Sequence, residues 1–293
     1  MRQARYRRLA REEQAFPPLL ATIHDPPKRL YLRGGGEAEL LARTSVAVVG
    51  ARSCSAYGAE VARLLGRELT AAGLVVVSGL ARGIDGEAHR GALEAGGPTV
   101  AVLGCGIDRD YPASHRSLAR AVADHGLIVS EYEPGVEPAP WQFPARNRII
   151  AGLCAATIVV EARERSGALI TADFALEDGR EVFAVPGEVT SSLSAGTNDL
   201  IRLGATPLTH PDDLFQALGV ERPAPPAPVI SSPAELVLVR VREAAAGVDE
   251  LARATGLSAD AVAVALSELE LAGLVAESAG TYRGATLDRS GEG

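Results

Sequence analysis

The stretch FPARNRIIAGLCAATIVVEARERSGALIT, residues 143–171, shows the pattern that decides the fold. An apolar helical run with two arginines and an asparagine leads into a short apolar strand, ATIVVE at 156–161, and Ser166-Gly167 then opens the next helix. A buried strand between two helices is typical of a parallel sheet covered on both faces. Guanidinium groups and the N–H groups of helix starts would then meet at one edge of the sheet, an arrangement suited to phosphate.

The same alternation continues in both directions along the chain. Short β-branched runs alternate with helical patterns before this stretch and after it, and the last strand–helix pair ends at Leu218. The strands are expected at 46–50, 74–78, 99–103, 127–130 and 181–185. The helices are expected near 58–72, 85–95, 114–124, 146–153, 168–178 and 198–203. We therefore predict an α/β fold over residues 46–219, an extended Rossmann-like, doubly wound and mainly parallel sheet.

The two ends of the chain differ from this pattern. Residues 1–45 are a basic lead-in with a helical start, and their Pro-Pro pairs and triple glycine argue against a long regular element. Residues 220–232 read as a Pro-rich linker. Residues 233–285 carry three helical patterns, the third capped by Ser258, and then a β-ribbon; this is the order of a winged-helix-like domain, and residues 286–293 are expected to be a disordered tail.

Composition limits the class of protein. The 293 residues are 47% hydrophobic, but no apolar run approaches the ~18 residues of a membrane span. The basic start lacks the apolar segment of a secretory signal, so we expect a cytoplasmic protein without a membrane partner. Cys54, Cys105 and Cys154 lack CxxC spacing, so we interpret them as reduced, packed thiols and expect no metal site.

The charge is unevenly distributed. The net charge is −8, and residues 46–217 carry 14 Lys and Arg against 21 Asp and Glu, whereas residues 1–45 carry nine against five. A binding site for a polyanion must therefore be a local patch in an acidic body. Since Lys28 is the only lysine, such a patch must consist of arginine.

The loop after the first predicted strand, GARSCSAYG at 50–58, occupies the place of a dinucleotide-binding GxGxxG motif. Arg52 stands where the middle glycine would be, and its side chain would obstruct a pyrophosphate, so we expect no NAD or FAD cofactor. The guanidinium could instead bind a backbone phosphate. The alternative is that Arg52 only caps the sheet edge or forms an ion pair there.

The loop after the second strand, SGLARGIDGEAH at 78–89, is rich in glycine and adds Arg82 to the same edge. Its glycines are expected to point backbone N–H groups outward before a helix capped by Asp85. Asp85 and His89 are four residues apart and resemble an acid–base pair. No nucleophile accompanies them, so a hydrogen bond at the helix start is the preferred interpretation.

Two further segments bear on nucleic acid. Trp141 and Phe143 precede Arg146 and Arg148, and aromatic side chains beside arginines suit base stacking combined with phosphate contact. For Phe143 taken alone, a place in the core is the favoured interpretation. The third C-terminal helix, 258–273, has three carboxylates and no Lys or Arg. It is therefore expected to bind protein or to stabilise its domain, and not to enter a DNA groove.

Taken together, the motifs resemble the DprA family, also called Smf, over about Phe16 to Leu218. They occur in order: VGAR with YG (49–58), SGLARGID with AH (78–89), GCGIDRDYP (104–112), SEY (130–132), FPARNRIIAGL (143–153), VVEARERSGALITA (159–172) and VFAVPG (182–187). The resemblance implies a homodimer that binds and protects single-stranded DNA in natural transformation, loads RecA for recombination, and uses no cofactor and no hydrolysis. Many members begin with a SAM-like domain of several dozen residues, and with about 15 residues before Phe16 we expect that domain to be absent or truncated here.

By the same resemblance, the DNA site combines arginines with backbone at the sheet edge. The expected site residues are Gly50, Arg52, Ser53, Ser78, Gly79, Arg82, Gly83, Phe143, Arg146, Asn147, Arg148, Ser166 and Gly167. An alternative is a Rossmann-type nucleotide hydrolase, like the lysine-decarboxylase-like phosphoribohydrolases. Their PGGxGT signature is incomplete here, because Pro186-Gly187-Glu188 lacks the second glycine. A factor that reads duplex DNA through the winged helix is disfavoured by the acidic third helix.

Overall fold

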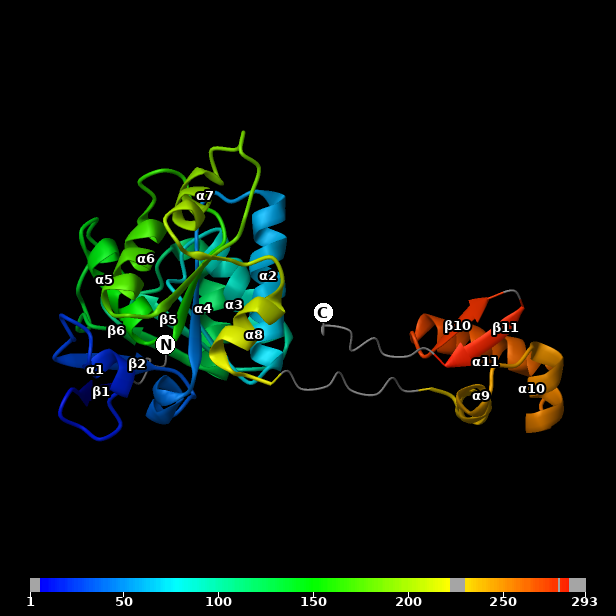
Figure 1. Ribbon diagram of the computed structural model, residues 1–293. Coiled ribbons are helices and arrows are strands. Elements are labelled where there is room, and N and C mark those ends of the chain that lie inside the picture. Colours follow the sequence, from blue (N-terminus) through cyan, green and yellow to red (C-terminus); the bar gives the residue numbers. More distant parts are fainter. Residues whose placement is uncertain (1–5, 222–229, 279, 285–293) are drawn as a thin grey trace. The chain divides into compact units, whose positions relative to one another are not determined.

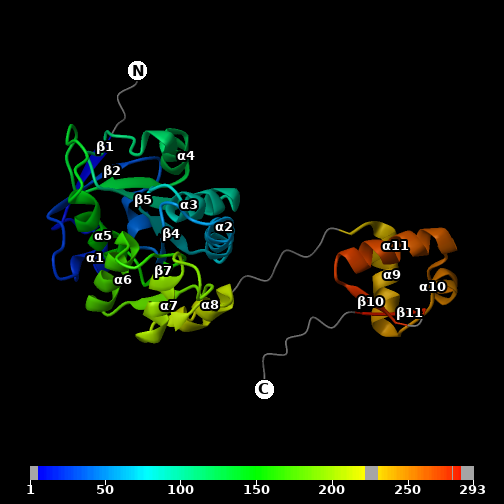
Figure 2. The ribbon, with the colours of Figure 1, turned by 90° about the horizontal axis from the view of Figure 1, so that it is seen from above.

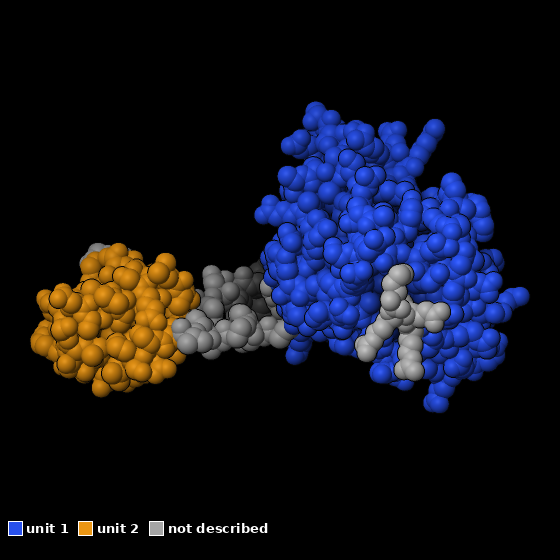
Figure 3. All heavy atoms as spheres, turned by 180° about the vertical axis from the view of Figure 1, so that it is seen from behind, with its two compact units in different colours: residues 1–223 blue, residues 224–293 orange. Residues whose placement is uncertain are grey.

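The computed structural model describes residues 6–221, 230–278 and 280–284. The chain forms two compact units, residues 1–223 and residues 224–293, each shown in its own colour in Figure 3 (see also Figure 1). Residues 222–229 of the predicted linker and the whole predicted tail, 286–293, lie outside the described residues.

The first unit is built on a nine-stranded sheet with the order β1-β2-β6-β5-β4-β3-β7-β8-β9. The strands β3 to β9 pair in parallel, and β1 and β2 add an antiparallel edge next to β6. This confirms the expected doubly wound, mainly parallel sheet. The strands are β1 Tyr6–Ala10, β2 Arg29–Arg33, β3 Ser45–Val49, β4 Val75–Ser78, β5 Thr99–Leu103, β6 Leu127–Ser130, β7 Ala156–Val159, β8 Glu181–Ala184 and β9 Thr206–Pro207.

The strand order reverses at the centre of this sheet. From β3 the chain moves outward through β4, β5 and β6, and it then returns to place β7 on the other side of β3. The loops that leave β3 and β7 therefore diverge, and they open a crevice outside the carboxyl ends of the strands. In open α/β sheets, ligands bind at this reversal.

Helices cover both faces of the sheet (Figure 2). Successive side chains of a strand point to opposite faces. Accordingly, Val46 and Val48 pack in the cluster formed with α2, α3 and α8, whereas Ala47 and Val49 pack in the cluster formed with α1, α5 and α6. The helices are α1 Pro18–Ala21, α2 Ala56–Ala71, α3 Ile84–Glu94, α4 Arg116–His125, α5 Gln142–Gly152, α6 Gly167–Glu177, α7 Ala195–Arg202 and α8 Pro211–Leu218, with short 3-10 turns at Ala38–Ala42 and Ala113–His115.

The prediction of a helical N-terminal start is wrong for the described residues. Tyr6–Ala10 is strand β1, and it pairs with β2 so that Leu9 lies opposite Leu30. Both leucines are buried, while Arg7 and Arg8 are exposed. Arg7 and Arg8 point to opposite faces of an edge strand, and both reach solvent because the strand is covered only near Leu9. The lead-in extends the main sheet and does not merely lie against it.

Two helix starts also differ from the predictions. The helix α5 begins at Gln142, about one turn before the predicted Arg146, because Pro144 is tolerated in a first turn where its missing N–H would have no partner. The N-cap of α3 is Gly83, with a φ of 73°, and not Asp85, which lies buried inside the first turn. Both corrections matter for the site, because they change which side chains face the crevice.

The second unit contains three helices and a hairpin: α9 Ser232–Glu243, α10 Val248–Thr255, α11 Ala259–Leu271, β10 Val275–Ser278 and β11 Thr281–Gly284. Its own core is formed by buried aliphatic side chains from all three helices. Ser258 caps α11 as predicted, accepting a hydrogen bond from the Ala261 N–H at 3.2 Å. No helix within the described ranges of either unit is both long and apolar enough to cross a membrane.

Candidate nucleic-acid interface

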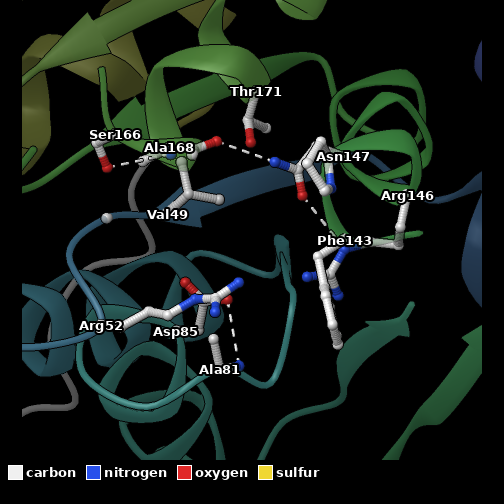
Figure 4. Close-up of a pocket in the computed structure, with 13 residues that line it drawn as sticks. Val49, Arg52, Ala81, Asp85, Phe143, Arg146, Asn147, Ser166, Ala168 and Thr171 are labelled. Carbon is white, nitrogen blue, oxygen red and sulfur yellow. Dashed lines mark hydrogen bonds between the residues drawn. The ribbon is translucent and has the colours of Figure 1, made fainter. Parts of the chain in front are cut away.

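A pocket of about 190 Å³ lies at the reversal of strand order, outside the carboxyl ends of β3 and β7. Figure 4 shows that Arg52 and Arg146 enter it from opposite sides, below the start of α6. Its walls come from the loops after β3, β4 and β7 and from the start of α5: Val49, Gly50, Arg52, Ala81, Asp85, Phe143, Pro144, Arg146, Asn147, Ser166, Gly167, Ala168 and Thr171.

A second pocket of about 230 Å³ adjoins the first. The two share Arg52, Ala81, Phe143 and Arg146, so they form one bipartite site. Its other walls are Gly79, Arg82, Leu103, Gly104, Cys105 and the segment 111–114. The first pocket is lined by the start of α6 and polar side chains, whereas the second combines three arginines with the rings of Tyr111 and Phe143. A phosphate suits the former and a flat ring suits the latter.

Arg52 is exposed, and within the described residues its guanidinium has neither a hydrogen bond nor an ion pair. Its central carbon lies 5.5 Å from the centre of the Phe143 ring, a cation–π contact that keeps the cation at the pocket mouth. The loop below it is fixed, because the Ala51 N–H donates to the Glu161 carbonyl at 2.7 Å and the Ser55 N–H donates to the Glu161 carboxylate at 2.9 Å. No ion pair of Arg52 is formed within the described residues, although its charge favours the ionised form of the buried Asp85.

Arg146 is buried, with 4% of its surface exposed. Its Nη1 donates to the carbonyls of Gly79, at 2.9 Å, and of Val102, and its Nε donates to the Asn147 side chain at 3.2 Å. Burial lowers the pKa of Arg146 to about 10, and the nearby Asp85 carboxylate opposes that shift. The group still carries its charge at neutral pH. A cation held in a pocket wall against a desolvation cost is a candidate functional group.

Asp85 contradicts the prediction that the loop after β4 points its N–H groups outward. Its carboxylate accepts hydrogen bonds from the N–H groups of Gly79, at 3.1 Å, and Ala81, at 3.3 Å. These amides therefore face inward and are not free for phosphate. Burial raises the pKa of Asp85, while the Arg146 charge and the two amides work in the opposite direction. Asp85 thus fixes the loop and compensates the buried arginine.

Asn147 joins two walls of the first pocket. Its amide donates to the Gly167 carbonyl at 2.9 Å and accepts from Arg146, so it links α5 to the first turn of α6. Ser166 caps α6, and its Oγ accepts from the Ala168 N–H at 3.3 Å. The start of α6 therefore points its partial positive charge into the pocket. A Cβ added at Gly167 would meet nothing within 4 Å, so the helix start is open on this side.

Comparison with known proteins places this site in a family. The family model described as DNA recombination-mediator protein A matches residues 7–219, and the model of the DprA winged helix domain matches residues 221–281. The chain belongs to the DprA/Smf family. Its described fold and its order of motifs agree with that membership, and the family is one of DNA-processing, recombination-mediator proteins.

Several DprA/Smf relatives cover most of the chain. DNA processing protein DprA of Streptococcus pneumoniae is 45% identical over 203 residues, 69% of this chain and 71% of the relative. Protein Smf of Escherichia coli is 37% identical over 294 residues, 96% of this chain and 78% of the relative. The solved structure of the S. pneumoniae protein has a TM-score of 0.69 at 42% identity, covering 73% of this chain and 75% of that chain. The DprA structure from Helicobacter pylori, described for its single-stranded DNA binding mode, has a TM-score of 0.66 at 32% identity and covers 73% and 95%.

Not every residue expected from the DprA/Smf resemblance reaches the bipartite site. Arg148 faces away, with its Nε 3.0 Å from Asp25 and its Nη2 2.7 Å from Glu131. Burial alone would lower its pKa, but these two carboxylates raise it overall. Ser78 is buried and donates to the Val48 carbonyl at 2.7 Å. Ser53 is exposed, but it does not line either pocket.

Other expected residues act as supports. Gly83 has a positive φ of 73°, and a Cβ there would collide with the Ala51 carbonyl, so glycine permits the loops after β3 and β4 to touch. A Cβ at Gly50 would lie 2.6 Å from Ile84. Arg82 is exposed on the wall of the second pocket and, like Arg52, has no ion-pair partner within the described residues.

Phe143 is half-buried and lines both pockets. Its ring stacks on Tyr111 with a centroid distance of 5.2 Å and an interplanar angle of 30°. It is neither a core plug nor fully exposed: Tyr111 stacks on the ring, and the Arg52 guanidinium also lies over it. Trp141, 65% exposed, makes an edge contact with Tyr132 at 6.2 Å.

The sequence reasoning missed Tyr111, Thr171 and the supporting role of Asp85. Tyr111 lies in GCGIDRDYP after β5, and Thr171 lies one turn into α6 at the end of SGALIT, so the two motifs themselves were the available signal. Asp85 and His89 do not form an acid–base pair, because the His89 Nδ1 lies 2.8 Å from the Thr99 hydroxyl. Burial raises the pKa of Cys105, in the second pocket, to about 11, so its thiol is protonated at neutral pH.

Proposed function

We propose that this protein binds single-stranded DNA across the bipartite site, and that as a cytoplasmic homodimer it protects the strand and delivers RecA to it during transformation or recombination. The observation that carries the proposal is the meeting of Arg52, Arg82 and Arg146 at the reversal of strand order in a protein whose net charge is −8. Two of these guanidinium groups are exposed without carboxylate partners in the described chain, as a phosphate ligand requires.

The two halves of the site suit the two halves of a nucleotide. Arg52 and the start of α6 offer charge-assisted donors for a phosphate. The Phe143–Tyr111 pair offers an aromatic face to a base, and a base can stack there only when it is not held inside a duplex. The H. pylori relative, described for its single-stranded DNA binding mode, supports the same preference here.

We infer that the protein acts by binding and not by covalent chemistry. The two glutamates that a nucleotide hydrolase could use near this edge are engaged elsewhere: Ser55 donates to Glu161, and Arg148 pairs with Glu131. A phosphoribohydrolase would release adenine from AMP. We expect no release above a protein-free control, and release that depends on Arg52 would favour the enzyme instead.

Fluorescence anisotropy with labelled single- and double-stranded oligonucleotides tests the binding proposal. We expect tight, salt-sensitive binding of the single strand, with a log–log salt slope of about −0.7 per phosphate contacted, and much weaker binding of the duplex. Equal affinity for both forms would contradict it. Light scattering measures the expected dimer, and RecA assembly on DNA coated with single-strand binding protein, with and without this protein, measures delivery.

A further inference from the structure

Several arginines on helices of the first unit are ion-paired, whereas other exposed ones, such as Arg8, Arg29 and Arg120, have no carboxylate partner among the described residues. Four arginines on α2, α3 and α7 are matched with carboxylates: Arg63 and Arg67 with Glu94, Arg90 with Glu87, and Arg202 with Asp199. Arg202 is exposed and the other three are half-buried. In the loops at the carboxyl edge of the sheet, the exposed arginines lack such partners among the described residues. These are Arg52 and Arg82, already described, and also Arg163 and Arg165.

Arg163 and Arg165 lie in the loop between β7 and α6, directly before Ser166, which lines the first pocket. The backbone of this loop is fixed. The Ala162 N–H donates to the Leu193 carbonyl at 2.8 Å, the Gly196 N–H donates to the Ala162 carbonyl at 2.8 Å, and the Ser166 N–H donates to the Arg163 carbonyl at 3.1 Å. The two side chains are exposed. A fixed backbone therefore carries two free cations beside the pocket.

We propose that Arg163 and Arg165 bind the phosphates that neighbour the one in the first pocket, so that the DNA strand continues from the pocket over the β7–α6 loop. The inference rests on the proposed single-strand binding. It adds the path that the strand takes beyond the first pocket, and two arginines that bind its phosphates. Phosphates recur at every nucleotide, so cations next to a pocket that holds one phosphate meet the next ones along the strand. Guanidinium groups without carboxylate partners need not break an ion pair to bind them.

Glu164 separates the two arginines, and it too is exposed without a partner in the described chain. A carboxylate beside a bound phosphate repels it. The substitution Glu164→Gln should therefore raise affinity for a long strand, an effect opposite in sign to that of removing the arginines. If the loop binds phosphate, removing Glu164 should raise the affinity and removing the arginines should lower it. If substitutions only disturb the structure of the loop, both should lower the affinity or leave it unchanged.

The test compares Arg163→Ala/Arg165→Ala with the matched control Arg67→Ala/Arg202→Ala, which removes the same charge from ion-paired positions away from the pockets. For oligothymidylate of about 20 nucleotides, we expect the first variant to bind roughly tenfold more weakly, with a salt slope shallower by about 1.4, and the control to bind as the wild type. For a strand of about three nucleotides, which fills only the pockets, both variants should match the wild type.

Equal loss in the two double variants, or no loss in the first, would overturn the proposed path while leaving single-strand binding itself intact. A wild-type protein that does not bind single-stranded DNA would instead overturn the proposed function. Circular dichroism melting of each variant shows whether the fold is preserved. If the first variant unfolds, the Glu164→Gln protein still decides, because unchanged or weaker binding by that variant contradicts the path.

Discussion

The carboxyl edge of the sheet and the outer surface of α2 and α3 both present arginines to solvent, but they differ in what surrounds those arginines. On α2 and α3, Glu87 and Glu94 pair with Arg63, Arg67 and Arg90. At the edge, Arg52 and Arg82 have no carboxylate partner in the described chain, and the nearby Asp85 is buried with Arg146. The field that a polyanion meets is therefore set by local pairing and not by the net charge.

Energetics supports the same contrast. Exposed ion pairs such as those on α2 and α3 contribute about 0–1 kcal/mol to stability, so they mainly neutralise the surface. The buried cation at the edge is different, because its desolvation lowers the pKa of Arg146 to about 10. The fold keeps this charge where it is unfavourable, directly below two exposed cations. Substituting the buried arginine and the exposed arginines separately shows which of them stabilise the fold and which bind DNA.

The largest expected effect is that of Arg146→Met. The substitution leaves the Gly79 and Val102 carbonyls without their donor and Asp85 without its nearby cation. We expect the free energy of unfolding of the first unit to fall by about 3 kcal/mol, as for other buried charges that lose a partner. Urea denaturation measures it, with Arg202→Ala as the exposed control. Unchanged stability with lost DNA binding would show instead that Arg146 acts as a direct ligand.

Next in size is the loss of the exposed cations. Arg52→Ala/Arg82→Ala should weaken single-strand binding by about 3 kcal/mol in total, since a charge-assisted hydrogen bond contributes about 1.5–3 kcal/mol. The salt slope should become shallower by about 1.4 for two lost phosphate contacts, and stability should be unchanged. Anisotropy titration at several salt concentrations measures both quantities.

The control for that prediction is Arg63→Ala/Arg67→Ala, which removes equal charge from α2. If it weakened binding as much as the edge variant, the contrast between the two regions would be lost, and the strand would have to be placed over α2 as well.

The contrast between the arginines at the carboxyl edge and those on α2 and α3 could be predicted only in part from the sequence. Strand and helix order, the reversal and the loops that carry Arg52 and Ser166 follow from apolar runs and glycine turns, because these patterns are local. Arg148 was misjudged although the predicted helix, 146–153, already contained both Arg146 and Arg148, because the helical spacing of the two side chains was not considered. Residues two apart on a helix point about 200° apart, so Arg146 and Arg148 cannot face one pocket once both lie inside the helix.

Ion pairs and hydrogen bonds between residues far apart in the chain could not be predicted from the sequence. Asp25 and Glu131, which neutralise Arg148, lie 123 and 17 residues away from it in the chain. The inward turn of the Gly79 and Ala81 amides depends on Asp85 being buried, and no spacing rule distinguishes a buried aspartate from an N-cap. Strand β1 was likewise hidden, because its partner β2 lies beyond two Pro-rich turns.

A third prediction concerns the protonation of the buried His89, which lies below the carboxyl edge of the sheet. Burial, followed by the charges of His115, Arg146 and Arg90, lowers the pKa of His89 to about 3. The unfolded chain, with a histidine pKa of about 6.5, takes up a proton on acidification that the folded chain refuses, so stability falls as the pH drops below about 6.5. Between pH 7 and pH 5 the expected loss from this group is about 2 kcal/mol.

The variant His89→Asn keeps a donor for the Thr99 hydroxyl and removes the titrating ring. Its free energy of unfolding should therefore depend less on pH than that of the wild type by the amount given above, even though it is lower at pH 7. Denaturation curves at the two pH values measure the difference. Identical pH dependence would mean that His89 has the same pKa in the folded protein as in the unfolded chain, so that it would carry positive charge below about pH 6.5.

The smallest effect is expected in the second unit, which has the fold of a DNA reader but the opposite charge. Asp260 and Glu270 on α11 are exposed, and the helix carries no Lys or Arg. Asp260→Asn/Glu270→Gln removes repulsion without creating attraction, so affinity for single-stranded and duplex DNA should change by less than about 0.5 kcal/mol. A clear gain in duplex binding would show that these carboxylates had kept α11 away from DNA.

Glu268 provides the matched control for charge on α11. Its carboxylate accepts hydrogen bonds from the Ser231 N–H at 2.7 Å and the Ser231 hydroxyl at 2.6 Å, and these bonds lower the pKa of Glu268. Glu268→Gln removes the same charge as Glu270→Gln, but it also disturbs the link between α11 and the start of α9. Only the former should lower the melting temperature of the second unit, and neither should alter DNA binding. If DNA affinity followed charge and not melting temperature in this pair, the helix would belong to the nucleic-acid surface after all.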